Sequence, residues 1–237
     1  MHEALNNLFS RIFHLFGYEL KRVKKKSNES VVSGRDPFHD QKILMSRSAS
    51  DIVIFDIGAH HGQTTEKYLY YFPRATIHCF EPSKSSQGVL NKKYKNQPKV
   101  HICPEAVSNK NSNVTLYINE FDATNSLFPR ASKEKRYYPS FASTCGEDQV
   151  QAISIDSYIA SNKVQNIDIL KLDIQGGELR ALKGAENLLR NSPPQIIYTE
   201  CMFVPHYESA PLFHEIWEFL IQFGYSLYSI YDIHYAR

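Results

Sequence analysis

The sequence has 237 residues, enough for one large domain or for one domain with a small extension. Hydrophobic residues make up 42% and charged residues 22%, a balance that supplies a core and excludes an intrinsically disordered chain. The 27 Lys and Arg residues against 25 Asp and Glu residues give a net charge of +2. We therefore expect no nucleic acid as the main partner.

The cysteines bear on the compartment and on metals. Cys79, Cys103, Cys145 and Cys201 include no pair at the short spacing of a zinc knuckle or a redox motif. Cys79 and Cys103 lie in apolar runs, where a free thiol behaves as a small hydrophobe. We therefore predict a reducing, cytoplasmic compartment. Because His, Asp and Glu also show no close metal-ligand spacing, we expect no metal site.

Residues 1–50 are predicted to form an N-terminal extension. Apolar residues recur at spacings of three and four from Leu5 to Phe16, as on an amphipathic helix, and a basic cluster follows at 21–26. One interpretation is peripheral binding of residues 1–26 to an anionic membrane surface. The other is a helix packed on the domain, or on a second subunit, with a solvated basic linker. Residues 27–36 indicate a flexible connection.

Residues 51–237 alternate between apolar strands and helices and are predicted to form the main domain. Strands are expected at 52–55, 75–80, 99–103, 113–119, 150–155, 167–172, 194–199 and 225–230. Helices are expected at 64–72, 83–96, from 156, at 179–190 and at 212–223. The polar residues 121–149 predict a long functional loop or lid. The alternation requires a mostly parallel sheet covered on both faces, so the fold class is α/β, doubly wound.

Five predicted strands end on or beside a carboxylate. In an open parallel sheet, ligands bind beyond the carboxyl ends of the strands, where the strand order reverses. A carboxylate in dry surroundings carries a desolvation cost unless it is paired, so function explains this recurrence better than stability does. The five acids are Asp56, Glu81, Glu105, Asp173 and Glu200.

The glycine loop after the first of these strands, DxGxxxG from Asp56 to Gly62, lacks the middle glycine of the dinucleotide fingerprint because His60 stands there. Glu81 ends the second strand, where a carboxylate can bond two ribose hydroxyls. A loop with little room for a pyrophosphate, followed by a ribose-binding acid, fits an adenosine ligand without phosphates. The structural alternative is a tight strand-to-helix turn and an exposed acid.

Four stretches resemble the FkbM family of S-adenosylmethionine-dependent methyltransferases. In chain order they are FDIGAHHGQTT at 55–65, CFEP at 79–82, ISIDS at 153–157 and LKLDIQGGELRALKGA at 170–185. The similarity runs from about Asp51 to Tyr228, and the last stretch is the most specific of the four. The resemblance implies a Rossmann-like class I methyltransferase sheet with S-adenosylmethionine as cofactor.

The resemblance also implies roles for single residues. The glycine loop would cradle the methionine end of the cofactor, Glu81 would bind the ribose, and a segment after the third strand would lie beside the adenine. Asp173 would face the methyl group and the acceptor. The implied cofactor-binding set is Asp56, Gly58, Ala59, His60, Gly62, Glu81, Pro82, Glu105 and Ala106, and the acceptor-side set is Ser126, Glu200 and His206.

Methyl transfer to oxygen requires positioning of the reactants and removal of the acceptor proton. Asp173 is our first candidate for the base, because its strand end lies beside the glycine loop. A structural acid that caps the Gly176-Gly177 turn or pairs with Lys171 is the alternative. His206 contacts substrate or simply packs its loop. The other candidate bases are Glu200, His60, His61 and His206.

The sequence departs from the family pattern in two places. His60 stands where asparagine is frequent. The chain also stops soon after the last predicted strand, whereas such sheets usually finish with a further antiparallel strand. Three explanations remain: the sequence is shortened, the last strand is absent, or residues 113–119 cover that edge of the sheet. An uncovered sheet edge would favour a homodimer.

The expected function is O-methylation of a hydroxyl on a small molecule or a glycan sugar. A non-catalytic scaffold of the same fold, recruited to a membrane or a partner by the basic N-terminal helix, is the alternative from another class. A nicotinamide-dependent oxidoreductase is a third interpretation, and the absent middle glycine speaks against it.

Overall fold

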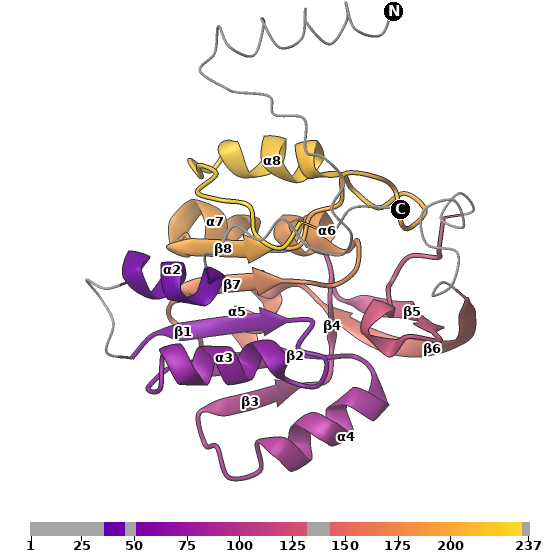
Figure 1. The fold of residues 1–237 in the computed structure, drawn as a ribbon, viewed down its shortest axis with the longest axis horizontal. Helices are drawn as coiled ribbons and strands as arrows, with labels where there is room; N and C mark the ends of the chain where they lie inside the picture. The colour runs from indigo at the N-terminus through magenta and orange to yellow at the C-terminus, as the bar shows by residue number, and fades with distance from the viewer. Residues whose placement is uncertain (1–35, 46–50, 132–142, 234–237) are drawn as a thin grey trace, which may run out of the picture. The chain divides into compact units, whose positions relative to one another are not determined.

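The computed structural model describes residues 36–45, 51–131 and 143–233 (Figure 1). Contacts divide the chain into two units: one holds residues 34–231 with 235–237, and the other holds residues 1–33 with 232–234. The first unit contains every element described below. The predicted amphipathic helix and the basic cluster lie outside the described residues, so both remain predictions.

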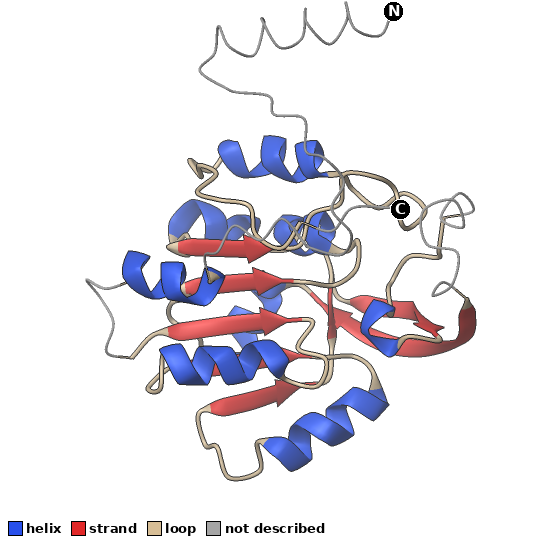
Figure 2. Cartoon of the chain, viewed as in Figure 1, coloured by secondary structure: helices blue, strands red, loops and turns tan. Residues whose placement is uncertain are grey.

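Five parallel strands form the main sheet, in the order β3-β2-β1-β7-β8 (Figures 1 and 2). The order reverses between β1 and β7, which is where a doubly wound sheet binds its ligands. The prediction of a mostly parallel α/β sheet is thereby confirmed. The strand bounds are β1 Val53–Ile57, β2 Thr76–Phe80, β3 Val100–Cys103, β7 Ile169–Leu172 and β8 Ile196–Thr199.

Helices cover both faces of this sheet, because its strands carry apolar side chains on both sides. Ile54 and Ile77 pack on one face with Tyr68 and Leu90, and Phe55 and Phe80 pack on the other. The first face is covered by α2 (Pro37–Leu44), α3 (Gln63–Tyr71) and α4 (Lys84–Lys93). The second is covered by α5 (Ile155–Asn162), α6 (Glu178–Lys183), α7 (Glu186–Asn191) and α8 (Phe213–Ile221).

A smaller sheet lies beyond the carboxyl ends of the main strands (Figure 1). It has the order β4-β6-β5, with β6 antiparallel to β5 and parallel to β4. Its bounds are β4 Ala106–Val107, β5 Ser112–Asn119 and β6 Thr144–Ile153, and a short 3-10 turn, η1 (Asp122–Thr124), follows β5. The small sheet and η1 therefore stand opposite the ends of β1 and β2.

Three expectations about these elements were wrong. The predicted loop at 121–149 is shorter, since β6 already begins at Thr144; its first residues are polar and exposed, so they lack the apolar signal of a strand. The predicted helix at 179–190 is two helices, parted near Gly184, where an added Cβ would lie 2.2 Å from the Ser108 carbonyl. Residues 225–230 form no strand.

Two further observations concern helix α2 and membranes. Sequence analysis assigned no helix to the range of α2, yet its Phe38 is buried against the rings of Tyr68 and Tyr198. The contacts thus group α2 with the sheet. Within the described ranges, no helix combines the length and the apolar character needed to span a membrane.

Candidate functional site

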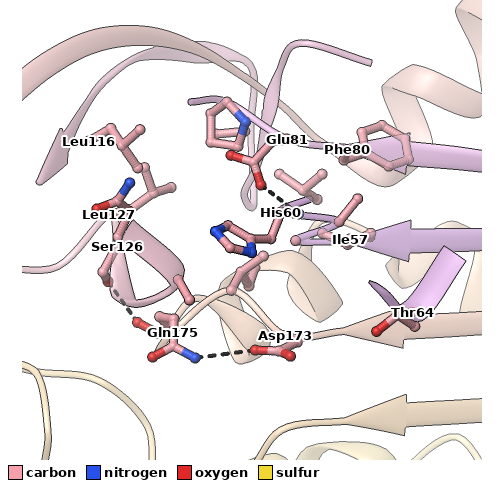
Figure 3. Close-up of a pocket in the computed structure, with 18 of the residues that line it drawn as sticks. Ile57, His60, Thr64, Phe80, Glu81, Leu116, Ser126, Leu127, Asp173 and Gln175 are labelled. Carbon is pink, nitrogen blue, oxygen red and sulfur yellow. Dashed lines mark hydrogen bonds between the residues drawn. The ribbon is translucent and has the colours of Figure 1, made fainter. Parts of the chain in front are cut away.

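A pocket lies at the carboxyl ends of the main strands, between them and the small sheet (Figure 3). Its volume is about 270 Å³, close to the lower end of the roughly 300–1,000 Å³ typical of ligand sites. Its lining comes from the glycine loop and the start of α3, the end of β2, the residues after β3, Leu116 of β5, the segment of η1, and the end of β7 with the loop after it. Nine of the thirteen predicted site residues line it: Gly58, Ala59, His60, Glu81, Pro82, Glu105, Ala106, Ser126 and Asp173.

The glycine loop is fixed by its backbone. The N–H groups of Gly58 and Ala59 donate to the Phe80 carbonyl at 3.0 and 3.1 Å, which ties the loop to the end of β2. Gly58 has φ +80°, and a Cβ there would lie 1.9 Å from the Asp173 carbonyl oxygen. Only glycine therefore allows the loop to approach the end of β7 this closely.

Gly62 supports the loop from behind and does not line the pocket. It also has a positive φ, at the start of α3, and its carbonyl accepts a 2.8 Å hydrogen bond from the Tyr94 hydroxyl. Its role is to begin the helix at the correct place. Between the two glycines, His60 has φ +48°, a region in which asparagine and histidine are enriched.

Glu81 is a buried polar group of the pocket that is held by two backbone hydrogen bonds. It is 7% exposed, and its two carboxylate oxygens accept the backbone N–H groups of His60 at 2.9 Å and Ser83 at 2.8 Å (Figure 3). Burial raises the pKa of Glu81, and these two hydrogen bonds act against that rise. Each oxygen retains one lone pair, so the carboxylate can accept two further hydrogen bonds.

The wall beside Glu81 is largely apolar. Phe80, Val107 and Leu116 line this part of the pocket together with Pro82 and Ala106. Glu105 lines it from the turn after β3 and is partly exposed. A flat apolar group can bury its faces between these side chains.

Asp56 lies behind the glycine loop and is fully buried. Its carboxylate lies 2.9 Å from the Lys171 ammonium on β7 and accepts a 2.6 Å hydrogen bond from the Thr65 hydroxyl. Lys171 also donates to the Gly58 carbonyl at 2.8 Å. Burial disfavours the charged form of Lys171, but the negative charges of Asp56 and Asp173 outweigh it and raise its pKa. Asp56 thus holds the loop in place through Lys171 and does not line the pocket.

Asp173 faces the pocket from the end of β7. Its side chain is 47% exposed, and its carboxylate lies 3.9 Å from the Lys171 ammonium. The Gln175 amide nitrogen donates to it at 3.2 Å and to Glu200 at 2.8 Å (Figure 3). The Tyr207 hydroxyl donates to the Gln175 amide oxygen at 2.8 Å. Gln175 therefore orients Asp173, and its own orientation is set by partners at both ends of the amide.

Sequence analysis did not single out Gln175 or Tyr207. Gln175 lies inside the LKLDIQGG stretch, so its position next to the glycines was an available signal. Tyr207 comes from beyond β8 and directly follows the candidate His206, so its place in the sequence was also an available signal; it does not line the pocket and acts on it through Gln175. Ser126, which was predicted, is buried and donates to the Gln175 carbonyl at 2.6 Å (Figure 3). It holds the loop after β7 against the segment that follows η1.

Glu178, and not Asp173, caps the turn at the two glycines. Its carboxylate accepts the N–H groups of Ile174 at 2.9 Å and Gly176 at 3.0 Å. Burial raises the pKa of Glu178 to about 7. Burial, together with the charges of Asp173 and Glu178, raises the pKa of Glu200 well above its ordinary value. Of these three acids, Asp173 is the one that opens onto the pocket.

Glu200 and His206 do not line the pocket. Glu200 reaches it through Gln175. His206 lies on the segment after β8, where its backbone carbonyl accepts the Ala131 N–H at 3.1 Å, and burial and Arg130 lower its pKa. The structure thus joins Glu200 to the site indirectly and places His206 beside it.

His60 and Asp122, which line the pocket, form a cluster with His61, and the potential ligand atoms of the three residues all lie within 4.8 Å of one another. We expected no metal site because no metal ligands are closely spaced along the chain. Asp122 comes from η1, far from the two histidines in sequence, so spacing could not reveal this cluster.

Comparisons with known proteins agree with this geometry. The model of the methyltransferase FkbM domain matches residues 56–227, most of the chain. The chain belongs to this family. A curated relative, the 2-O-methyltransferase NoeI of Sinorhizobium fredii (strain NBRC 101917 / NGR234), is 23% identical over 167 residues, which cover 68% of this chain and 67% of the relative. The resemblance drawn from the four stretches of sequence is confirmed, and with it the methyltransferase class.

A solved structure also aligns with the chain. It is an rRNA methylase from Streptococcus thermophilus, 11% identical, with a TM-score of 0.40 and coverage of 84% of this chain and 93% of that one.

Proposed function

We propose that this protein transfers a methyl group from S-adenosylmethionine to a hydroxyl group of a small molecule or a glycan sugar. The observation that carries the proposal is Glu81. It is a buried carboxylate beside a glycine loop, and both of its oxygens are fixed by backbone N–H groups and can still accept hydrogen bonds. Two hydroxyls on neighbouring ribose carbons match this arrangement.

We call the glycine loop, Glu81 and the apolar wall the donor half of the pocket, and the loop after β7 with the segment of η1 the acceptor half. The rest of the donor half fits the remaining parts of such a cofactor. The apolar wall formed by Val107 and Leu116 suits a flat adenine, and the close approach at Gly58 leaves backbone facing the pocket. When bound, S-adenosylmethionine would supply a methyl group on a positively charged sulfur. An acceptor oxygen can bond to that methyl carbon while the carbon–sulfur bond breaks and the neutral thioether leaves. Asp173 places negative charge on the same side of the pocket and favours a cation there.

Asp173 is the residue we propose as the base. A hydroxyl becomes an effective nucleophile once a base takes its proton. Glu200 is not placed for this role, because it does not line the pocket and reaches it only through Gln175. Asp173 lines the pocket and is oriented by Gln175. Of the three acids at the ends of β7 and β8, namely Asp173, Glu178 and Glu200, Asp173 is therefore the one with access to an acceptor in the pocket.

Oxygen is proposed as the acceptor atom because the curated relative is named a 2-O-methyltransferase. The acceptor would lie beside the loop after β7 and the segment of η1, both of which line the pocket. Ser126, Asn125 and Asp122 bring polar groups to that side. Polar groups of this kind suit a hydroxylated acceptor better than a purely apolar one.

Methyl transfer tests the proposal directly. The protein is incubated with S-adenosylmethionine labelled in its methyl group and a panel of oligosaccharides and hydroxylated small molecules, and products are followed by mass spectrometry. Asp173→Asn is expected to lower the rate on a responding acceptor by roughly 10²–10⁴-fold. Asp148→Asn, a change at an exposed position on β6, is the matched control and should leave the rate unchanged.

Two outcomes would overturn parts of the proposal. Full activity of Asp173→Asn would remove Asp173 from the role of base while leaving methyl transfer intact. A lack of labelled product with every acceptor, together with a failure to bind S-adenosylhomocysteine, would contradict the function as a whole and favour a non-catalytic scaffold.

A further inference from the structure

Two segments that are far apart in the sequence meet at one wall of the pocket. His60 and His61 belong to the glycine loop, and Asp122 belongs to η1. His60 Nε2 lies 3.0 Å from Asp122 Oδ1, and His61 Nε2 lies 3.4 Å from Asp122 Oδ2. We call these three residues the His-His-Asp cluster.

The spacing of the cluster matches the shell of a metal ion. Around a tetrahedral ion with bonds of roughly 2.0–2.1 Å, neighbouring ligand atoms lie roughly 3.3–3.4 Å apart. The two measured separations, 3.0 and 3.4 Å, lie close to this value. The imidazole rings stack with their centroids 3.8 Å apart, which places both Nε2 atoms on the same carboxylate. The two nitrogens and the carboxylate thus lie within 4.8 Å of one another, close enough to share one ion once the two rings tilt toward it.

His60 Nε2 supplies a second, independent observation. This atom is buried, and among the described residues it has no hydrogen-bond partner, because its contact with Asp122 is close but not aligned as a hydrogen bond. A buried nitrogen without a partner is unfavourable by roughly 1–3 kcal/mol in general. The positive φ of His60, a backbone conformation with its own cost, keeps the ring at this place (Figure 3). Coordination of an ion would satisfy the nitrogen.

The opposite edge of the His60 ring also has a suitable neighbour. Its Nδ1 lies 3.4 Å from the side-chain amide of Gln63. In the structure the Gln63 amide nitrogen faces Nδ1, so binding of an ion at Nε2 requires the ring proton to move to Nδ1 and the amide to turn its oxygen toward Nδ1, which then donates to it. This is the usual support of a metal-binding histidine, whose other nitrogen is held by a hydrogen-bond acceptor.

We propose that His60, His61 and Asp122 bind a divalent transition-metal ion of the zinc class at the pocket wall. Two imidazoles and one carboxylate favour Zn²⁺ or Co²⁺ over Mg²⁺ and Ca²⁺, which prefer oxygen ligands. Three protein ligands leave a position for water or for an oxygen of a pocket ligand. The ion ties the glycine loop to η1 and so joins the donor half of the pocket to the acceptor half.

Titration with Co²⁺ tests the site without any donor or acceptor, so its outcome is independent of the proposed methyl transfer. The purified protein, freed of metal with a chelator, is expected to bind one equivalent of Co²⁺ with intense visible absorption, and Zn²⁺ should displace it. His61→Asn and Asp122→Asn should each weaken binding at least about tenfold. Gln63→Ala should weaken it by roughly tenfold as well, because it removes the support of His60.

Matched controls separate this cluster from other histidines and acids. His214→Asn and Asp148→Asn change exposed residues outside the cluster and should bind Co²⁺ as the unchanged protein does. Circular dichroism of each variant establishes that it is folded, and His61 and Asp122 are partly exposed, so their replacement should not unfold the chain.

Three results would overturn the proposal. The first is no saturable binding of Co²⁺ or Zn²⁺ by the unchanged protein. The second is binding by folded His61→Asn and Asp122→Asn that is as tight as in the unchanged protein. The third is displacement of Co²⁺ by an equal concentration of Mg²⁺, which would show a site without the preference of imidazole ligands.

Discussion

The two halves of the pocket are built in different ways. In the donor half, the glycine loop and Glu81 are held by backbone hydrogen bonds to the end of β2 and to the first residues after it. In the acceptor half, Asp173 is held by side chains, through Gln175, from segments far along the chain. A half fixed by backbone suits a constant ligand, whereas a half fixed by side chains can change its specificity by substitution.

A buried ion pair joins the two halves from below. Asp56 on β1 and Lys171 on β7 are 0% and 4% exposed at their side chains, and the strands that carry them are neighbours at the reversal of strand order. Lys171 also contacts the carbonyl of Gly58 and lies near Asp173. The relative position of the two halves should therefore depend on this pair.

Removal of Lys171 should have the largest effect. Lys171→Met leaves Asp56 charged and without its buried partner, so we expect the free energy of unfolding to fall by about 3–5 kcal/mol in urea denaturation. Lys99→Met is the matched control, because Lys99 pairs with Asp51 at the surface and its loss should cost less than about 1 kcal/mol. Equal losses in the two variants would show that the buried pair does not join the halves.

Substitution of Gly58, where the glycine loop approaches β7, should cause the next largest loss of stability. Gly58→Ala introduces a side chain where φ is positive and where the Cβ overlaps the Asp173 carbonyl. We expect a loss of about 2–4 kcal/mol in thermal unfolding, with weakened binding of the donor. Gly88→Ala in α4 meets no atom within 4 Å and should stabilise the helix by up to about 1 kcal/mol. If both substitutions are neutral, the close approach is not required.

The acceptor half should also show its own pH dependence. Burial raises the pKa of Glu178 to about 7, so between pH 4.5 and 7 the folded protein holds a proton that the unfolded chain releases. The free energy of unfolding should fall as pH rises through this window, by up to about 1.4 kcal/mol per pH unit. The free energy of unfolding is measured by urea denaturation across this pH range for the unchanged protein and for Glu178→Gln. The contribution that falls with rising pH should be absent from the variant.

A buried histidine under the donor half should make the free energy of unfolding change with pH in the opposite direction. On β2, burial lowers the pKa of His78 to about 4, so its contribution to stability is lost as pH falls from 6.5 to 4. His78→Gln should therefore flatten the acid side of the curve, whereas the exposed His214→Gln should not. A slope of the same sign from His78 and Glu178 would contradict the assignment of these two groups.

The hydroxyl of Tyr207 should have the smallest effect. The Tyr207 hydroxyl lies within hydrogen-bond distance of both Gln175 and the Thr124 carbonyl, and Tyr207→Phe removes both contacts. We expect kcat to fall by roughly two- to tenfold, or about 0.5–1.5 kcal/mol, with donor binding unchanged. Tyr225→Phe is the control: its hydroxyl donates to the Pro194 carbonyl, outside the pocket, and should change stability alone. A fall in donor affinity with Tyr207→Phe would show that the two halves are not independent.

The sequence revealed the donor half better than the acceptor half, for a physical reason. Asp56, Gly58 and Glu81 lie on consecutive strand ends, and contacts between neighbouring segments leave a short motif. Gln175 lies in a recognisable stretch, but its importance depends on Tyr207 and Glu200, which come from elsewhere in the chain. Contacts of this kind depend on the folded chain and leave no spacing to read.

The fold was predicted where apolar runs were present and misjudged where they were absent. The buried strands β1, β2 and β7 carry such runs, whereas most of β6 is exposed and polar and was taken for a loop. In the opposite direction, the apolar residues Leu227, Tyr228 and Ile230 were taken for a strand, although they are exposed. An apolar run therefore indicated a strand only where a partner strand was present to pair with it.

The most direct test of the central claim is calorimetric titration with S-adenosylhomocysteine, with NAD titrated in parallel. The unchanged protein should bind S-adenosylhomocysteine and bind NAD poorly. Glu81→Gln should weaken the binding by roughly 10–100-fold, because hydrogen bonds to a charged carboxylate are lost, and the exposed Glu120→Gln should not change it. Tighter binding of NAD, or equal affinity of Glu81→Gln and the unchanged protein, would contradict a donor site built around Glu81.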